Sequence, residues 1–157
     1  MKSRLLFYRQ ETPYSCVPAC LRVVLFVFGL DISEAELRVL CDCTPFGTEA
    51  LKAVDAVRNL GFPKTAKWTL SVNDLVIQLS SGFYPIVFIN LLPIDGVKVG
   101  HAVVVIAIDQ ADVSIYDPLY GERILPRSTF NTAWAMMHNL SILVQAWVHR
   151  RFCRESF

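Results

Sequence analysis

The spacing of apolar residues changes near residue 82, and this change constrains the fold more than any other feature of the chain. Before it, apolar residues recur at the three- and four-residue intervals of amphipathic helices. We expect helices over four segments, 15–28, 33–41, 48–61 and 71–82. Beyond it, short apolar runs rich in β-branched residues are typical of strands. We expect strands over 85–90, 101–108, 113–117 and 141–148, a short strand at 124–125, and one more helix over 128–137.

Helices that precede strands in this way favour an α+β domain. We expect the N-terminal helices to pack on one side of a C-terminal antiparallel sheet, because short turns such as residues 110–112 join successive strands. The length of 157 residues fits one domain over 1–157. Hydrophobic residues make up 54% and charged residues 18%, so the chain can bury a dense core and disorder is not expected.

Charge and hydropathy exclude several classes of function. The chain has 15 basic and 14 acidic residues, without the basic face that nucleic acids require, and the basic stretch 149–154 is interpreted as a solvated chain end. The apolar run 5–8 is shorter than the roughly 7–15 apolar residues of an export signal. The longest charge-free stretch, 75–94, contains Pro85 and Pro93 and fits a helix, a turn and a strand better than a membrane span. We therefore expect a soluble, cytoplasmic protein.

The cysteine pattern predicts free thiols and no metal site. The chain has five cysteines, Cys16, Cys20, Cys41, Cys43 and Cys153. An odd count without an export signal indicates a reducing compartment. Cys41 and Cys43 are not followed by a second pair at the spacing of zinc ligands, and no cofactor is expected.

Cys16 is the candidate nucleophile. It lies at the expected start of the first helix, after Ser15, which can cap that helix, and before Pro18, which the first turn tolerates. Unpaired backbone N–H groups and the positive end of the helix dipole stabilise a thiolate at such a position. Cys20 follows one turn later on the same helix and is interpreted as a core residue.

Three further residues complete a plausible hydrolytic site with Cys16. Gln10 lies six positions before Cys16, so its amide can fold back and join the Cys16 N–H in an oxyanion hole. His101 opens a β-branched strand, and Asp117 ends the next strand, which brings the two to the same end of the sheet. An aspartate there can orient the imidazole toward the thiol. The hairpin register is not fixed by the sequence.

Each of these residues taken alone has an ordinary structural explanation, as a core thiol, a strand histidine, a turn aspartate or a loop glutamine. Their order, element types and spacing nevertheless agree with one chemistry, in which a nucleophile, a base, an orienting group and an oxyanion donor act together. His138 and His149 fit no such role and are expected on the surface or in packing.

Several stretches of the chain resemble the C39 family of cysteine peptidases, the bacteriocin-processing endopeptidases with a papain-like fold. Members carry a Q-x5-C-G-x-A-C-L start, a later G-H-x-V-V-V strand and a D-P after the next strand. The matching stretches are Gln10-Glu-Thr-Pro-Tyr-Ser-Cys16-Val-Pro-Ala-Cys20-Leu21, Gly100-His101-Ala-Val-Val-Val105 and Tyr116-Asp117-Pro118-Leu-Tyr-Gly121, with a similar helix around Phe130 and Trp134. Val17 departs from the pattern, because the family usually has glycine after the nucleophile.

The resemblance implies Cys16 as nucleophile, His101 as general base, Asp117 as orienting acid and Gln10 as oxyanion donor. It also implies cleavage at Gly-Gly-type sites in the leaders of secreted peptides. Many members are the N-terminal domain of an ABC exporter, and a chain of this length is expected to act free-standing or beside a separate exporter. Two alternatives stay open: a catalytically silent module that binds leader peptides, and a cysteine-dependent acyltransferase.

Overall fold

The computed structural model describes residues 5–146, and its helices and strands follow the order expected from the periodicity, apart from two additional short elements, a strand at Ala66–Thr69 and a helix at Leu92–Asp95. The helices are α1 (Cys16–Val27), α2 (Glu34–Leu40), α3 (Ala50–Asn59), α4 (Val72–Ser80), α5 (Leu92–Asp95) and α6 (Arg127–Ala135). The strands are β1 (Ala66–Thr69), β2 (Ile86–Asn90), β3 (Gly100–Ile108), β4 (Asp112–Asp117), β5 (Gly121–Pro126) and β6 (Leu140–Leu143).

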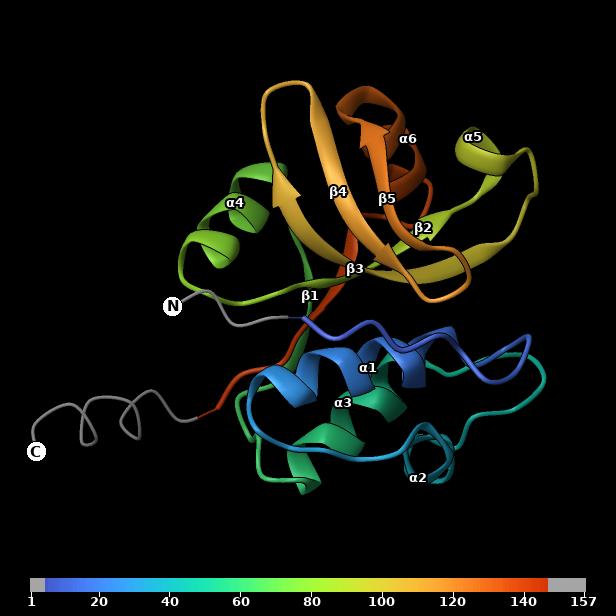
Figure 1. Ribbon diagram of the computed structural model, residues 1–157, viewed down its shortest axis with the longest axis vertical. Helices are drawn as coiled ribbons and strands as arrows, with labels where there is room; N and C mark the ends of the chain where they lie inside the picture. Colours follow the sequence, from blue (N-terminus) through green and yellow to red (C-terminus); the bar gives the residue numbers. More distant parts are fainter. Residues whose placement is uncertain (1–4, 147–157) are drawn as a thin grey trace, which may run out of the picture.

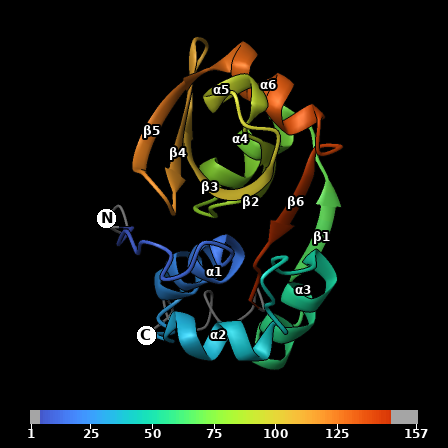
Figure 2. The same cartoon turned by 90° about the vertical axis from the view of Figure 1, so that its right-hand side faces the viewer.

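Within residues 5–146 the strands form one six-stranded sheet in the order β1-β6-β2-β3-β4-β5, and every neighbouring pair is antiparallel. Helices α1, α2 and α3 gather at one end of the molecule, whereas α4, α5 and α6 accompany β2–β5 at the other (Figure 1). Figure 2 shows β1 and β6 running side by side between these two ends, with α3 beside the start of β1. The expected α+β class, with N-terminal helices on an antiparallel sheet, is confirmed.

In the described part of the chain, apolar side chains form two core clusters, one on each face of the sheet. Alternation along a strand explains the division, since successive side chains point to opposite faces. Phe88, Ala102 and Val104 join α1–α3 in the first cluster, whereas Ile89 and Val103 join α4 and α6 in the second. The central strands are therefore covered on both sides, which is why β2 and β3 appear in the sequence as continuous apolar runs.

Three features differ from the expectations. Helix α4 does not lie with the other early helices, because its Leu75 packs into the second cluster on the opposite face. Strand β1 and the short helix α5 had no prediction. The strand expected over 141–148 is β6, which ends at Leu143, and the basic stretch 149–154 with His149 and Cys153 lies outside the described residues.

The charge-free stretch 75–94 consists of the second half of α4, a turn, β2 and the start of α5. Within residues 5–146, no helix combines the length and the apolar character needed to cross a membrane.

Candidate active site

Helix α1 begins at Cys16, so this half-buried thiol lies at the positive end of the helix dipole. Ser15 occupies the N-cap position but makes no side-chain cap hydrogen bond, which corrects the expectation that its hydroxyl caps the helix. The first N–H groups of any α-helix lack an intrahelical acceptor. The start of α1 therefore presents its main-chain donors beside the Cys16 thiol. Val17 packs into the first core cluster and is not exposed.

The β3–β4 pairing brings His101 and Asp117 together. Val104 on β3 pairs with Tyr116 on β4, and this register carries Asp117 to the first residues of β3, where His101 lies. His101 Nε2 and Asp117 Oδ1 are 2.8 Å apart. The two side chains are 5% and 0% exposed, so solvent does not weaken their interaction.

His101 lies between Cys16 and Asp117. Burial alone would lower the pKa of His101, but hydrogen bonds with Asp117 and with Cys16 raise that pKa to about 9. Because Nε2 faces Asp117, Nδ1 is the ring nitrogen that remains for the Cys16 thiol. The imidazole therefore holds a proton at neutral pH and can share it with the sulfur.

Asp117 is held as a carboxylate by several donors. Burial would raise the pKa of Asp117, but the hydrogen bond and charge of His101 lower it, and further hydrogen bonds from the Leu119 N–H and Arg123 act in the same direction. The Leu119 N–H donates to Oδ1 at 2.9 Å. A charged aspartate beside a protonated imidazole is the result.

Arg123 is a residue of this site that the sequence analysis missed. Its Nη1 donates to Asp117 Oδ2 at 3.1 Å and to Asp95 Oδ2 at 3.0 Å, while Nη2 donates to Asp95 Oδ1 at 2.7 Å. The guanidinium thus joins the buried end of β4 to helix α5. The β4–β5 hairpin gives a sequence signal, because pairing of Asp117 with Gly121 places residues 117 and 123 on one face.

Gln10 lies next to the turn that follows Asp117. Its main-chain N–H donates to the Pro118 carbonyl at 2.9 Å, and its side-chain Nε2 donates to the Thr12 carbonyl at 2.7 Å. Within residues 5–146, the buried Oε1 atom of Gln10 has no hydrogen-bond partner. In the same residues Nε2 makes one hydrogen bond, so its second amide hydrogen remains for another acceptor. No hydrogen bond joins the Gln10 side chain to Cys16 in the described part of the chain.

Cys20 lies one turn after Cys16 in an entirely different environment. Its thiol is buried against the Ala102 carbonyl, with a sulfur–oxygen distance of 3.4 Å, and burial raises the pKa of this thiol well above the ordinary value. The core interpretation of Cys20 is confirmed. Cysteines 16, 20, 41 and 43 are all free, and residues 5–146 contain no group of side chains arranged to hold a metal ion.

Comparison with known proteins identifies the family. A model of the peptidase C39 family matches residues 4–145. The chain belongs to the peptidase C39 family. A search of curated proteins gave no match.

Solved structures of C39 peptidases share the fold. A C39-like peptidase described from Bacillus anthracis superposes with a TM-score of 0.77 at 19% identity, covering 90% of this chain and 94% of that protein. The peptidase domain of Streptococcus ComA, a bi-functional ABC transporter involved in quorum sensing, superposes with a TM-score of 0.73 at 26% identity, covering 90% of this chain and 99% of that domain. A double glycine motif protease from an AMS/PCAT transporter, solved with the leader peptide, superposes with a TM-score of 0.72 at 20% identity, covering 90% of this chain and 91% of that protein. The resemblance inferred from the motifs is confirmed.

Proposed function

We propose that this protein is a cysteine endopeptidase that hydrolyses peptide bonds through an acyl-enzyme on Cys16. The observation that supports this most is the position of His101, which bonds to Asp117 through one ring nitrogen and faces the helix-start thiol with the other. Membership of the peptidase C39 family supports the same chemistry. The proposed roles are Cys16 as nucleophile, His101 as acid and base, and Asp117 as the group that orients His101.

In the acylation step, the Cys16 sulfur bonds to the carbonyl carbon of the substrate and the C–N bond breaks. The proton held by His101 passes to the leaving amine. In the second step His101 accepts a proton from water, whose oxygen bonds to the acyl carbon as the C–S bond breaks and the free acid leaves. The raised pKa of His101, about 9, keeps the proton required for the first step available through the neutral range.

Each step passes through a tetrahedral oxyanion, and we propose two donors for it. One is the main-chain N–H at the start of α1, where Cys16 is the first helical residue. The other is the second amide hydrogen of the Gln10 side chain. The main-chain N–H of Gln10 donates to the Pro118 carbonyl and so holds this residue next to the Asp117–Pro118 turn. Donors fixed before the reaction stabilise the developing charge without reorganisation.

The proposed substrate is a peptide with a Gly-Gly-type leader, cleaved on the cytoplasmic side before export. Similarity to an AMS/PCAT double glycine motif protease bound to its leader peptide, and to the ComA peptidase domain of an ABC transporter, supports this substrate class. A separate ABC exporter is the proposed partner. Small residues before the cleaved bond also suit access to a half-buried thiol.

A panel of synthetic leader peptides tests the proposal, with Gly-Gly sites and Gly-to-Val controls, and product masses as the readout. Cleavage after Gly-Gly that disappears in Cys16→Ala is expected. Retained cleavage in Cys16→Ala contradicts the mechanism, and binding without cleavage indicates a silent leader-binding module. An added amine separates hydrolysis from acyl transfer, because a transferase forms the amide in place of the free acid.

A further inference from the structure

Helix α2 contributes one buried carboxylate that the proposed mechanism does not use. Glu34, the first residue of α2, is 1% exposed, whereas Glu36 on the same helix is exposed. Burial raises the pKa of Glu34, which means that ionising this carboxylate costs free energy unless other groups stabilise the charge. The polar groups around Glu34 therefore indicate what its burial achieves.

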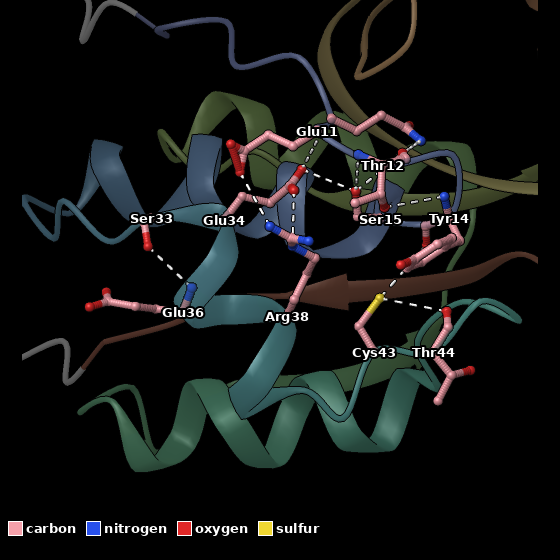
Figure 3. A network of polar contacts seen from close by, with 11 residues as sticks. Glu11, Thr12, Tyr14, Ser15, Ser33, Glu34, Glu36, Arg38, Cys43 and Thr44 are labelled. Carbon is pink, nitrogen blue, oxygen red and sulfur yellow. Dashed lines mark hydrogen bonds and ion pairs between the residues drawn. The ribbon is translucent and has the colours of Figure 1, made fainter.

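Most of the partners of Glu34 belong to the segment that leads into Cys16 (Figure 3). Glu34 Oε1 accepts from the Glu11 N–H at 2.9 Å and lies 3.2 Å from the Ser15 hydroxyl. Glu34 Oε2 forms an ion pair with Arg38 Nε at 3.3 Å, and Arg38 Nη2 lies 3.7 Å from Glu11 Oε1. One carboxylate thus joins α2 to Glu11 and Ser15, which precede Glu34 by 23 and 19 positions in sequence.

Further hydrogen bonds extend this contact to both ends of the segment. The Ser15 hydroxyl accepts from the Thr12 N–H at 3.1 Å, and the Thr12 carbonyl accepts from Gln10 Nε2 at 2.7 Å. Glu34 is therefore connected to the Gln10 amide through Ser15 and Thr12. At the other end, Ser15 is the residue immediately before Cys16.

The same contacts explain why Ser15 does not cap α1. An N-cap serine ordinarily accepts from the N–H of the second or third helical residue. The third residue here is Pro18, which has no N–H, and the Ser15 oxygen already accepts from Thr12. The Ser15 proton lies within reach of Glu34 Oε1 and of the Thr12 carbonyl. The donors at the start of α1 are consequently left for another acceptor.

We propose that Glu34 is a positioning residue for the oxyanion hole, which fixes the segment 10–15 so that the Gln10 amide and the first N–H groups of α1 converge on one point. This role rests on the proposed peptidase function. It is separate from the His101–Asp117 pair, which is held by the sheet and forms no hydrogen bond or ion pair with Glu34 among the described residues. Loss of Glu34 should then affect the oxyanion and leave the reactivity of the thiol unchanged.

Glu34→Ala and Glu34→Gln test this role against Glu36→Ala and Glu36→Gln, their matched controls on the exposed side of α2. We expect Glu34→Ala to lower kcat roughly 10- to 100-fold with little change in KM, because an oxyanion donor acts mainly in the transition state. Glu34→Gln keeps an oxygen that can accept from the Glu11 N–H and the Ser15 hydroxyl, so we expect a smaller decrease in kcat than in Glu34→Ala. Both Glu36 variants should match the wild type.

Two readouts on Cys16 distinguish an oxyanion effect from general damage. Alkylation by iodoacetamide forms no oxyanion, so its rate against pH should be the same in Glu34→Ala and the wild type. Binding of a Gly-Gly aldehyde forms a tetrahedral adduct that needs the oxyanion donors, so it should weaken about 10-fold or more. The aldehyde needs no hydrolysis, so the role is tested even if the wild type cleaves no peptide.

The outcomes separate the inference from the proposed function. A wild type that neither cleaves leader peptides nor binds the aldehyde contradicts both. Cleavage by the wild type with equal kcat and aldehyde affinity in Glu34→Ala overturns the role of Glu34 alone. A shifted alkylation profile in Glu34→Ala also overturns it, because the effect would then reach His101. If Glu34→Ala does not fold, as circular dichroism would show, the same readouts on Glu34→Gln decide.

Discussion

The two sides of the candidate site are held in place by different means. On the sheet side, His101 and Asp117 are fixed by the β3–β4 ladder, whose hydrogen bonds belong to the main chain. On the helix side, Gln10 and Cys16 depend on a loop that is tied to α2 through the Glu34 carboxylate. We infer that the geometry of the sheet side tolerates substitutions of neighbouring side chains, whereas the geometry of the helix side depends on a few polar side chains.

Cys16 lies where the two sides meet, so Cys16→Ala should have the largest effect on catalysis. We expect peptide hydrolysis to fall to the background rate, because the neighbouring thiol of Cys20 is buried, has a raised pKa and cannot replace Cys16. Leader-peptide cleavage followed by mass spectrometry measures this loss. Cys43→Ser is the matched control, since Cys43 is also half-buried and, within residues 5–146, its thiol makes only long hydrogen bonds, to the Tyr14 and Thr44 carbonyls. A Cys43→Ser variant as inactive as Cys16→Ala would contradict this assignment.

Asp117→Asn tests the sheet side. The hydrogen bond and the charge of the Asp117 carboxylate both contribute to the raised pKa of His101, about 9, and asparagine cannot supply that charge. The pKa of His101 should therefore fall, so the imidazolium is lost at lower pH and the alkaline limb of kcat/KM moves below pH ~9. We expect kcat to fall roughly 100-fold or more at neutral pH. A pH–rate profile measures both effects, and an unchanged alkaline limb would show that Asp117 does not control His101.

Arg123→Gln should also lower catalytic activity, but less than Asp117→Asn does. The guanidinium donates to Asp117 Oδ2, but His101 and Leu119 still hold the other oxygen. We expect kcat/KM to fall about 3- to 10-fold, since a partly exposed ion pair is worth about 1 kcal/mol. Glu122→Gln, on the exposed side of the same strand, is the control. An Arg123→Gln variant with wild-type kinetics at every pH would exclude a role for this residue.

Thermal stability should depend on pH through the His101–Asp117 pair. The pKa of His101 is raised to about 9, so its stabilising contribution is full below about pH 6.5 and is lost as the pH rises toward 9. The lowered pKa of Asp117 acts in the opposite sense, and its contribution is lost only as the pH falls into the acid range. We expect Tm to drop by a few degrees between pH ~6.5 and ~9. His101→Ala should flatten this dependence, and an equal drop in that variant would assign it to other groups.

The sheet side was largely predictable from the sequence, and the helix side was not. A strand that begins with His101 and a following strand that ends in Asp117 must bring the two residues close, once a turn joins the strands. Arg123 follows from the same reasoning applied to the next hairpin. Glu34 gave no such signal, because an acidic residue in the first turn of a helix is favoured by the dipole whether or not it is buried. Its burial depends on how the loop 10–15 packs against α2.

The elements that lacked a prediction have similar causes. Strand β1 is four residues long and mostly exposed, so it has no apolar run, and it forms by pairing with the distant β6. Pro93 entered the sequence analysis only as evidence against a membrane span, although proline also suits the first turn of a helix such as the short α5. The face of the sheet on which α4 packs depends on the chain path and not on the periodicity of α4.

The rate of Cys16 alkylation against pH, in the wild type and in His101→Ala, is the most direct test of the site and requires no known substrate. An ordinary cysteine titrates near pH ~8.5, so its labelling slows steeply below that value. If His101 forms an ion pair with the helix-start thiol, Cys16 should label fast well below pH ~7 in the wild type, and His101→Ala should move the profile to higher pH. A Cys16 that labels like Cys43, or a profile that does not move in His101→Ala, would contradict the pairing of thiol and imidazole.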